Sequence, residues 1–148
     1  MAKKRPAKTK LDAFVLDASV TLAWYFEGES NAYADAIADR FPAVQAIVPA
    51  IWPLEVANAV VMGERRNRGT VLTASQWATY LTALPIAVDE PLLRRAFNEI
   101  LTIARDRILS VYDASYLELA IRSGLPIASL DTKLRAAAAA LGVRIYEP

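Results

Sequence analysis

The sequence of 148 residues contains no histidine and no cysteine. These two absences exclude Ser-His-Asp triads, cysteine nucleophiles, disulfides, iron–sulfur clusters and zinc held by His or Cys. Lysine is scarce as well, because Lys133 is the only one after residue 10. Acid, base and ligand chemistry is therefore left to Asp, Glu, Lys133, Tyr and the hydroxyl residues, and carboxylate oxygens favour Mg²⁺ or Mn²⁺.

Long apolar runs are also missing, since Asp17 interrupts the stretch from Ala13 to Tyr25. No segment approaches the roughly 20 apolar residues of a membrane span, so we expect no membrane association and a cytoplasmic protein. The length fits a single domain, which we expect over residues 11–148. The hydrophobic fraction of 55% is on the high side and is consistent with an apolar surface that a partner covers.

The net charge of +1 is unevenly distributed along the chain. Removing the five basic residues of segment 1–10 from the 17 of the whole chain leaves 12 basic and 16 acidic residues in 11–148, a net charge of −4. With Pro6 and nothing to bury, segment 1–10 is predicted to be a disordered basic tail. It is either an electrostatic arm for nucleic acid or a solvated leader without a role.

Short apolar runs alternate with longer helical patterns, which predicts a mostly parallel sheet with helices on both faces. The expected strands are Ala13–Leu16, Ala46–Val48, Pro85–Val88, Pro126–Ser129 and Val143–Tyr146. The expected helices are Val20–Phe26, Asn31–Asp39, Ile51–Arg68, Ala74–Leu84, Glu90–Arg105, Ser110–Ser123 and Thr132–Leu141. The predicted fold class is α/β, a three-layer α/β/α domain with a parallel sheet of about five strands.

Four acidic residues interrupt or close apolar runs, where solvent-facing charge is not expected: Asp17, Glu55, Asp113 and Asp131. A buried carboxylate without a partner is costly, so such groups are paired with cations, hydrogen-bonded or bound to a metal. In the predicted sheet all four fall at the carboxyl edge of the strands, where ligands bind in parallel α/β folds. The pattern predicts a hard-cation site at this edge.

Each acid also has a purely structural explanation. Asp113 follows Ser110 at the spacing of a capping box. Asp131 suits the N-cap of the helix after it, and Asp17 is placed to bond loop amides. Glu55 is hardest to explain in this way, because the other residues on its helical face are mostly apolar. Four such residues at one edge favour a functional site over four separate caps.

The acids lie in four sequence blocks: Leu16-Asp17-Ala-Ser19, Pro49-x-x-Trp-x-Leu-Glu55-Val-x-Asn58-Ala, Leu109-Ser-Val-Tyr-Asp113-Ala-x-Tyr-Leu-x-Leu-Ala and Leu125-Pro-x-Ala-Ser129-Leu-Asp131-x-x-Leu134. In order and spacing these blocks resemble those of PIN-domain ribonucleases, and most closely the VapC toxins of type II toxin–antitoxin pairs. The resemblance covers residues 11–147. It departs from the family pattern in two respects: Ser129 stands where Thr is commoner, and a basic tail precedes the first strand.

The resemblance implies a metal-dependent endoribonuclease. Asp17, Asp113 and Asp131 would hold one or two Mg²⁺ or Mn²⁺ ions, with Glu55 as a ligand or a base. The metal would lower the pKa of a water molecule that attacks the RNA phosphodiester. Three polar residues would orient carboxylates or waters, with ordinary capping or packing as an equal alternative: Ser19, Asn58 and Ser129.

RNA binding next to an acidic site requires flanking cations, and arginine suits phosphate because its planar guanidinium binds two oxygens at once. The candidates are Arg65, Arg66 and Arg68, followed by Arg94, Arg95, Arg105 and Arg107. Most arginines on helices are simply solvated, so only some of these positions are expected to bind. The cluster Trp24, Tyr25 and Phe26 would suit base stacking, although core or dimer contact is the commoner role.

The resemblance further implies a VapB-like antitoxin, whose disordered tail wraps the toxin and blocks its site, and a homodimer. Three other readings stay open: a housekeeping RNA-processing PIN nuclease, a receiver-type signalling domain and a catalytically silent binding module. The receiver domain needs an adjacent acidic pair after the first strand, where this chain has Asp17-Ala-Ser19. The complete set of four acids disfavours the silent module.

Overall fold

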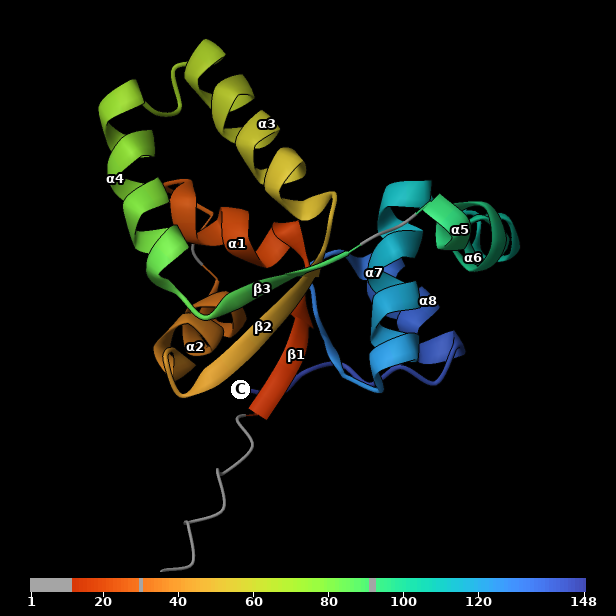
Figure 1. Cartoon of the computed structure of the whole chain (residues 1–148). Coiled ribbons are helices and arrows are strands. Elements are labelled where there is room, and N and C mark those ends of the chain that lie inside the picture. Colours follow the sequence, from red (N-terminus) through yellow and green to blue (C-terminus); the bar gives the residue numbers. More distant parts are fainter. Residues whose placement is uncertain (1–11, 30, 91–92) are drawn as a thin grey trace, which may run out of the picture.

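The computed structural model describes residues 12–29, 31–90 and 93–148, and the predicted tail 1–10 lies outside these ranges, as does residue 11. At its centre are four parallel strands: β1 (Asp12–Leu16), β2 (Val44–Pro49), β3 (Ile86–Asp89) and β4 (Ile127–Ala128). Figure 1 shows helices on both sides of this sheet. The predicted α/β class with a parallel sheet between helices is therefore confirmed.

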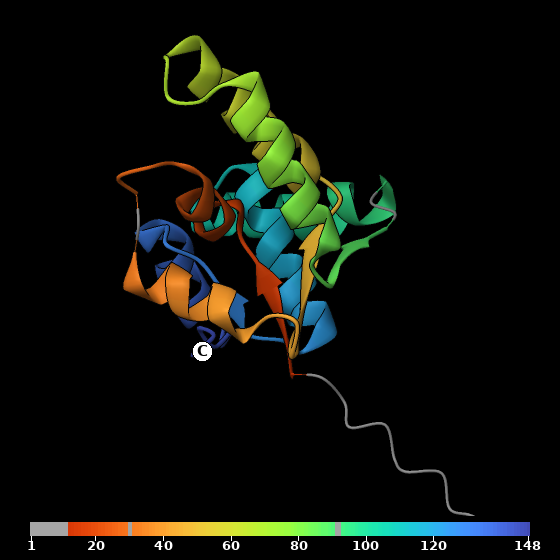
Figure 2. The ribbon, with the colours of Figure 1, turned by 90° about the vertical axis from the view of Figure 1, so that its left-hand side faces the viewer.

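Helices supply every long connection between the strands. Helices α1 (Ala18–Tyr25) and α2 (Ala32–Arg40) connect β1 to β2, and α3 (Trp52–Arg65) and α4 (Val71–Ala83) connect β2 to β3. Between β3 and β4 lie α5 (Leu93–Arg95), the π-helical turn η1 (Ala96–Ile100), α6 (Leu101–Arg107) and α7 (Val111–Ser123), and α8 (Thr132–Ala140) follows β4. The α3–α4 hairpin projects from the domain (Figure 2). None of the described helices is long and apolar enough to cross a membrane.

The core forms where the strands meet helix α7. Parallel strands between helix layers are apolar on both faces, and Phe14, Val15 and Leu16 of β1 are all fully buried. Helix α7 packs against β1, β2 and β4, and its residues 114–120 are all buried. The helix that begins near Asp113 is therefore held in the middle of the domain.

One predicted helix differs from the structure. The pattern over Glu90–Arg105 predicts a continuous helix, whereas the described part of this segment is divided into α5, the π-helical turn η1 and α6, and residues 91–92 lie outside the described ranges. A π-helical turn inserts one extra residue into the helical repeat. Hydrophobic periodicity does not encode such an insertion, so the sequence pattern could not reveal it.

The predicted strand Val143–Tyr146 is reduced to a single parallel bridge between Ile145 and Ile127. The Ile127 N–H donates to the carbonyl of Arg144 at 2.9 Å, and the Tyr146 N–H donates to the carbonyl of Ile127 at 2.8 Å. Because β4 has only two residues, it offers no longer ladder to its neighbour. The sheet therefore has four strands within the described residues, one fewer than the expected number of about five.

The order of the strands, β3-β2-β1-β4, places a reversal at β1. The chain builds the sheet outward from β1 to β3 and then returns to pair β4 with the free edge of β1. In parallel α/β sheets such a reversal leaves a crevice at the carboxyl ends of the two strands concerned, and ligands bind there. Asp17 directly follows β1 and Ser129 directly follows β4. The fold thus places two of the predicted site residues at its topological switch point.

The end of helix α1 and helix α3 make a close contact at Gly63. A β-carbon at position 63 would lie 2.5 Å from Cε1 of the buried Phe26 ring, and the Arg68 guanidinium lies 4.4 Å from the centre of the same ring. Alanine normally favours a helix over glycine by about 1 kcal/mol. Here Gly63→Ala must displace the ring, so we expect the free energy of unfolding in urea to fall by about 1–3 kcal/mol.

The control for this prediction is the same substitution in a Phe26→Leu background. Leucine removes the ring atoms nearest to position 63, so Gly63→Ala should cost less there. Stabilisation of the wild-type chain by Gly63→Ala would show that the ring does not oppose a β-carbon.

Candidate active site

Asp17 is the most buried of the four predicted acids. It directly follows β1, forms the N-cap of α1 and is 6% exposed. Two hydroxyls donate to the same carboxylate oxygen, Oδ2: Ser19 Oγ at 2.5 Å and Ser129 Oγ at 2.7 Å. Among the described residues none donates a hydrogen bond to Oδ1. One oxygen of Asp17 is therefore held by the protein and the other remains available.

The two serines are fixed as donors to Asp17 because their oxygens already accept backbone hydrogen bonds. Ser19 Oγ accepts from the Leu130 N–H at 2.9 Å, and Ser129 Oγ accepts from the Asp131 N–H at 3.0 Å. The bond between Ser19 and Leu130 connects the first turn of α1 with the segment between β4 and α8, and the bond between Ser129 and Asp131 lies within that segment. The structure thus places both predicted serines beside Asp17 and gives each a definite hydrogen-bonding role.

Asp131 is the N-cap of α8, the structural role that the sequence predicts for it. Its Oδ1 accepts from the N–H groups of Lys133 and Leu134 at 2.9 and 3.0 Å. The cap uses only this oxygen, and no described residue donates to Oδ2. Capping and a second function are therefore compatible for this residue.

Asp113 lies in the first turn of α7, but the capping side chain of that helix belongs to Ser110. Ser110 Oγ accepts from the Asp113 N–H at 3.0 Å, which involves only the backbone of Asp113. The Asp113 carboxylate is half-buried, and it has no hydrogen bond or ion pair with any residue that the structure describes. The capping explanation thus leaves this carboxylate unexplained.

Glu55 lies in the first turn of α3 and is half-buried. Its Oε2 accepts a hydrogen bond from Tyr116 Oη at 2.5 Å. Tyr116 belongs to α7 and is fully buried. The sequence block Asp113-Ala-x-Tyr116 contains this tyrosine three residues after an acid, a spacing that places both residues on one helical face. That signal was present in the sequence, but no role was assigned to Tyr116 from it.

Asp17 and Glu55 are each affected by the charges of neighbouring acids. Burial is the largest cause of the raised pKa of Asp17, to which the charges of Asp113 and Asp131 add, while the two serine hydroxyls act in the opposite direction. Burial likewise raises the pKa of Glu55, and Asp17 and Asp113 raise it further. In the described ranges no Lys or Arg forms an ion pair with any of the four.

Helix N-termini offset part of this negative charge. Asp17 and Asp131 are N-caps, and Glu55 and Asp113 lie in first helical turns. The N-terminus of a helix carries roughly half a positive elementary charge. The ends of α1, α3, α7 and α8 therefore all favour anions at this edge of the sheet.

The oxygen atoms of these acids are of the type that Mg²⁺ prefers. Within residues 12–29, 31–90 and 93–148, no three acidic side chains are arranged so that they hold an ion directly between them. Mg²⁺ in proteins usually keeps several water molecules and contacts only one or two carboxylates. An uncompensated set of carboxylates with available oxygens fits such an ion.

The remaining predicted residues lie apart from the acids. Asn58 is exposed, one turn along α3 from Glu55. Arg65 lies ten residues beyond Glu55 on the same helix, which is roughly 15 Å along the axis. Arg68 pairs with Glu29 at 2.5 Å and so has an intramolecular partner, whereas Arg66 is exposed and forms no ion pair among the described residues.

The aromatic cluster of α1 packs inside the domain. Trp24 Nε1 donates to the carbonyl of Ala34 at 2.7 Å, and the Tyr25 ring lies 4.7 Å from the Trp77 ring. Phe26 is buried against Gly63. These contacts support the packing role rather than base stacking.

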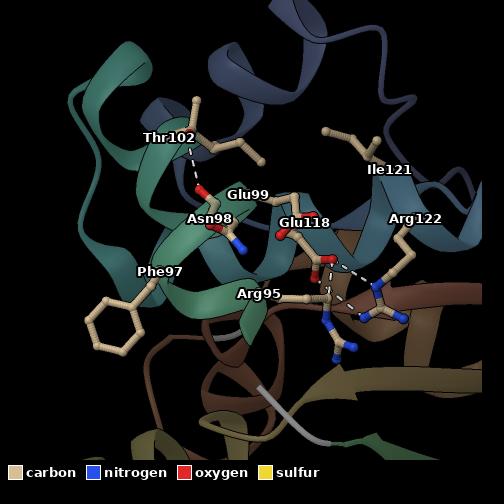
Figure 3. Close-up of a pocket in the computed structure, with 9 residues that line it drawn as sticks. Arg95, Phe97, Asn98, Glu99, Thr102, Glu118, Ile121 and Arg122 are labelled. Carbon is tan, nitrogen blue, oxygen red and sulfur yellow. Dashed lines mark hydrogen bonds and ion pairs between the residues drawn. The ribbon is translucent and has the colours of Figure 1, made fainter. Parts of the chain in front are cut away.

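Beside α7, Arg95, Glu118 and Arg122 are among the residues that line a cavity of about 690 Å³ (Figure 3). Glu118 of α7 is 4% exposed, accepts from Arg122 Nε at 2.7 Å and lies 3.4 Å from Arg95 Nε. Asp89, at the end of β3, lies 2.5 Å from Arg122 Nη2 and 3.1 Å from Arg95 Nη2. Two arginines and two acids thus form a neutral quartet that connects α7 to β3. Arg95, a sequence candidate for RNA binding, is engaged in it.

Comparison with known proteins bears on this arrangement. The family model of the PIN domain matches residues 14–140. The chain belongs to the PIN-domain family. Proteins of this family are generally metal-dependent nucleases.

Solved structures agree with the PIN-domain fold. PAE2754 from Pyrobaculum aerophilum is 27% identical with a TM-score of 0.63, covering 86% of this chain and 80% of that one. FitAcB from Neisseria gonorrhoeae is 20% identical with a TM-score of 0.63, covering 91% of this chain and 97% of that one. No curated protein matches the chain significantly.

The raised pKa of Asp17 generates a prediction about pH. The folded state retains this proton at pH values where the unfolded chain has released it, so the free energy of unfolding in EDTA should decrease as pH rises through the interval between the ordinary pKa of 3.8 and the raised one. Glu55 acts in the same direction. Asp17→Asn should flatten this profile and stabilise the metal-free protein near neutral pH.

Urea denaturation between about pH 4 and pH 8 measures the effect. Asp106→Asn, which removes an exposed acid on α6, is the matched control and should leave the slope unchanged. Profiles of equal slope for wild type and Asp17→Asn would contradict the role given to Asp17.

The neutral quartet generates a separate prediction about stability. After Glu118→Ala, Arg95 and Arg122 share a single acidic partner, Asp89. We therefore expect the free energy of unfolding to fall by about 2–3 kcal/mol. This lies between the values for surface and fully buried ion pairs, because Arg122 is partly solvated. Glu29→Ala, which breaks an exposed pair with Arg68, should cost no more than about 1 kcal/mol. Equal losses in the two variants would show that the quartet is not an anchor.

Proposed function

We propose that this PIN-domain protein is a metal-dependent endoribonuclease and the toxin of a VapBC-type toxin–antitoxin pair. The observation that supports this most directly is the buried Asp17 carboxylate, with one oxygen held by two serines, the other available, and three further acids nearby without a protein cation. A buried carboxylate without a positive partner is costly, as the raised pKa of Asp17 reflects, and a bound divalent cation would remove that cost. The four sequence blocks that resemble VapC toxins support the finer assignment.

The roles of the residues follow from their contacts. Asp17 would bind Mg²⁺ or Mn²⁺ through Oδ1, because Oδ2 is engaged by the serines, and Asp113 would bind through its unengaged carboxylate. Asp131 would contribute Oδ2 while Oδ1 caps α8. Glu55 would act as a ligand or as a base for the attacking water. When bound, the metal supplies water activation and neutralises charge on the phosphate oxygens.

Phosphate binding outside the metal site is assigned to exposed arginines that form no ion pair among the described residues. Arg65 and Arg66 lie at the end of α3, and their exposed side chains have no ion pair among the described residues. Arg68 would have to leave Glu29 first. The net charge of −4 over residues 11–148 makes such local cations necessary for RNA binding.

An antitoxin and a second copy of the chain are the proposed protein partners. Several large apolar side chains are exposed on the projecting hairpin and on the segment that follows β3: Leu54, Val71, Leu72, Leu93 and Phe97. Clusters of exposed apolar residues mark protein interfaces. A VapB-like antitoxin and a homodimer would cover them in a cytoplasmic complex.

The proposed function is tested by RNA cleavage with purified protein. Asp113→Asn and Asp17→Asn should each reduce Mg²⁺- or Mn²⁺-dependent cleavage by about 100-fold or more, which is the order seen when a group that stabilises transition-state charge is removed. EDTA should abolish cleavage by the wild type, and Asp106→Asn should cleave normally. Cleavage near the wild-type rate by both site variants would refute the assignment.

The toxin assignment has its own test. Expression of the wild-type chain should arrest growth, Asp113→Asn should not, and co-expression of a cognate VapB-like antitoxin should restore growth. RNA cleavage without growth arrest would favour an RNA-processing nuclease.

A further inference from the structure

Tyr116 connects the core of the domain with the acid cluster. Its ring is fully buried in α7, and its hydroxyl donates to Glu55 Oε2 at 2.5 Å. No other described residue donates a hydrogen bond to the Glu55 carboxylate. The position of this carboxylate therefore depends on a single side chain, which lies 61 residues away in the sequence.

Without this hydrogen bond, the Glu55 side chain would be expected to rotate toward solvent. Its carboxylate is half-buried, and the charges of Asp17 and Asp113 repel it. A long side chain near the surface relieves such repulsion by rotating into water. The hydrogen bond from Tyr116 opposes that rotation, because a bond to a charged acceptor is stronger than one between neutral groups.

Tyr116 itself has little freedom to move. It lies within the buried run 114–120 of α7, and its side chain is fully buried. Burial, followed by the charge of Asp17, raises the pKa of Tyr116 above its ordinary value. The hydroxyl therefore keeps its proton and remains a donor throughout the pH range in which proteins work.

We infer that Tyr116 is a positioning residue that holds the Glu55 carboxylate toward Asp17 and Asp113. This inference rests on the proposed function for its consequence, since the acids are the proposed metal ligands. Tyr116 does not contact the metal in this scheme and acts through Glu55. It links the rigid core of the sheet to the one acid of the cluster that the first turn of α3 supplies.

The test combines Tyr116→Phe with isothermal titration of Mn²⁺. Phenylalanine keeps the ring and removes the donor, so the affinity for Mn²⁺ should fall by about 10-fold to 100-fold, as for other residues that orient a metal ligand. In a Glu55→Ala background the same substitution should change the affinity by less than about 2-fold, because the residue through which Tyr116 acts is gone. An equal loss in both backgrounds would overturn the inference.

The matched control is Tyr146→Phe. Tyr146 is also buried, and its hydroxyl lies 3.4 Å from the carboxylate of Asp12, at the amino end of β1. It should leave Mn²⁺ affinity unchanged. A loss equal to that of Tyr116→Phe would show a general effect of removing a buried hydroxyl and would overturn the inference.

A second measurement needs no metal and separates this inference from the proposed function. In EDTA, the effects of Tyr116→Phe and Glu55→Ala on the unfolding equilibrium constant should be non-additive by about tenfold, as expected for a hydrogen bond to a charged group. Additive effects would overturn the inference even if the protein cleaves RNA. Non-additive effects in a protein that neither binds Mn²⁺ nor cleaves RNA would retain the role of Tyr116 and refute the proposed function.

Discussion

A concentration of negative charge at one edge of the sheet is the constraint to which the surrounding structure is adapted. Asp17, Glu55, Asp113 and Asp131 meet there, and within the described residues no lysine or arginine pairs with them. Their repulsion costs stability, which the protein offsets with four helix N-termini, two serine hydroxyls and one tyrosine. The topology contributes as well, because the reversal at β1 brings the carboxyl ends of β1 and β4 side by side, and Asp17 and Ser129 directly follow them.

Helix α7 carries two groups of charged residues, one without ion-pair partners among the described residues and one fully paired. Toward its N-terminus lies Asp113, whose carboxylate has no partner among the described residues. One to three turns further lie Glu118 and Arg122, which pair with each other, and Arg122 also pairs with Asp89. The paired group is neutral and anchors the helix, whereas the unpaired group favours an external cation. This contrast supports the acidic edge as the proposed functional site, whereas cavity size does not, since the cavity of Figure 3 lies beside the neutral quartet.

Much of the fold was predictable, because strands and helices differ in their hydrophobic period and in the residues that end them. The four strands of the sheet and most of the helices follow the expected ranges within a few residues. The predictions failed where the outcome depended on a neighbour: Val143–Tyr146 pairs at one residue only because β4 is so short, and η1 interrupts a segment whose pattern is helical. The local hydrophobic periodicity of a segment encodes neither the length of the neighbouring strand nor an extra residue inserted into a helix.

The sequence by itself determined the chemical repertoire, the α/β alternation and the presence of four acids at one edge. It did so because composition and the position of a residue within a strand or helix are local properties. Only the tertiary structure decided the partners: both serines donate to one oxygen of Asp17, Tyr116 holds Glu55, and Arg95 is engaged in the quartet rather than exposed. Hydrogen bonds and burial depend on which segments meet in space, and Ser129 and Asp17, for example, lie 112 residues apart in the chain.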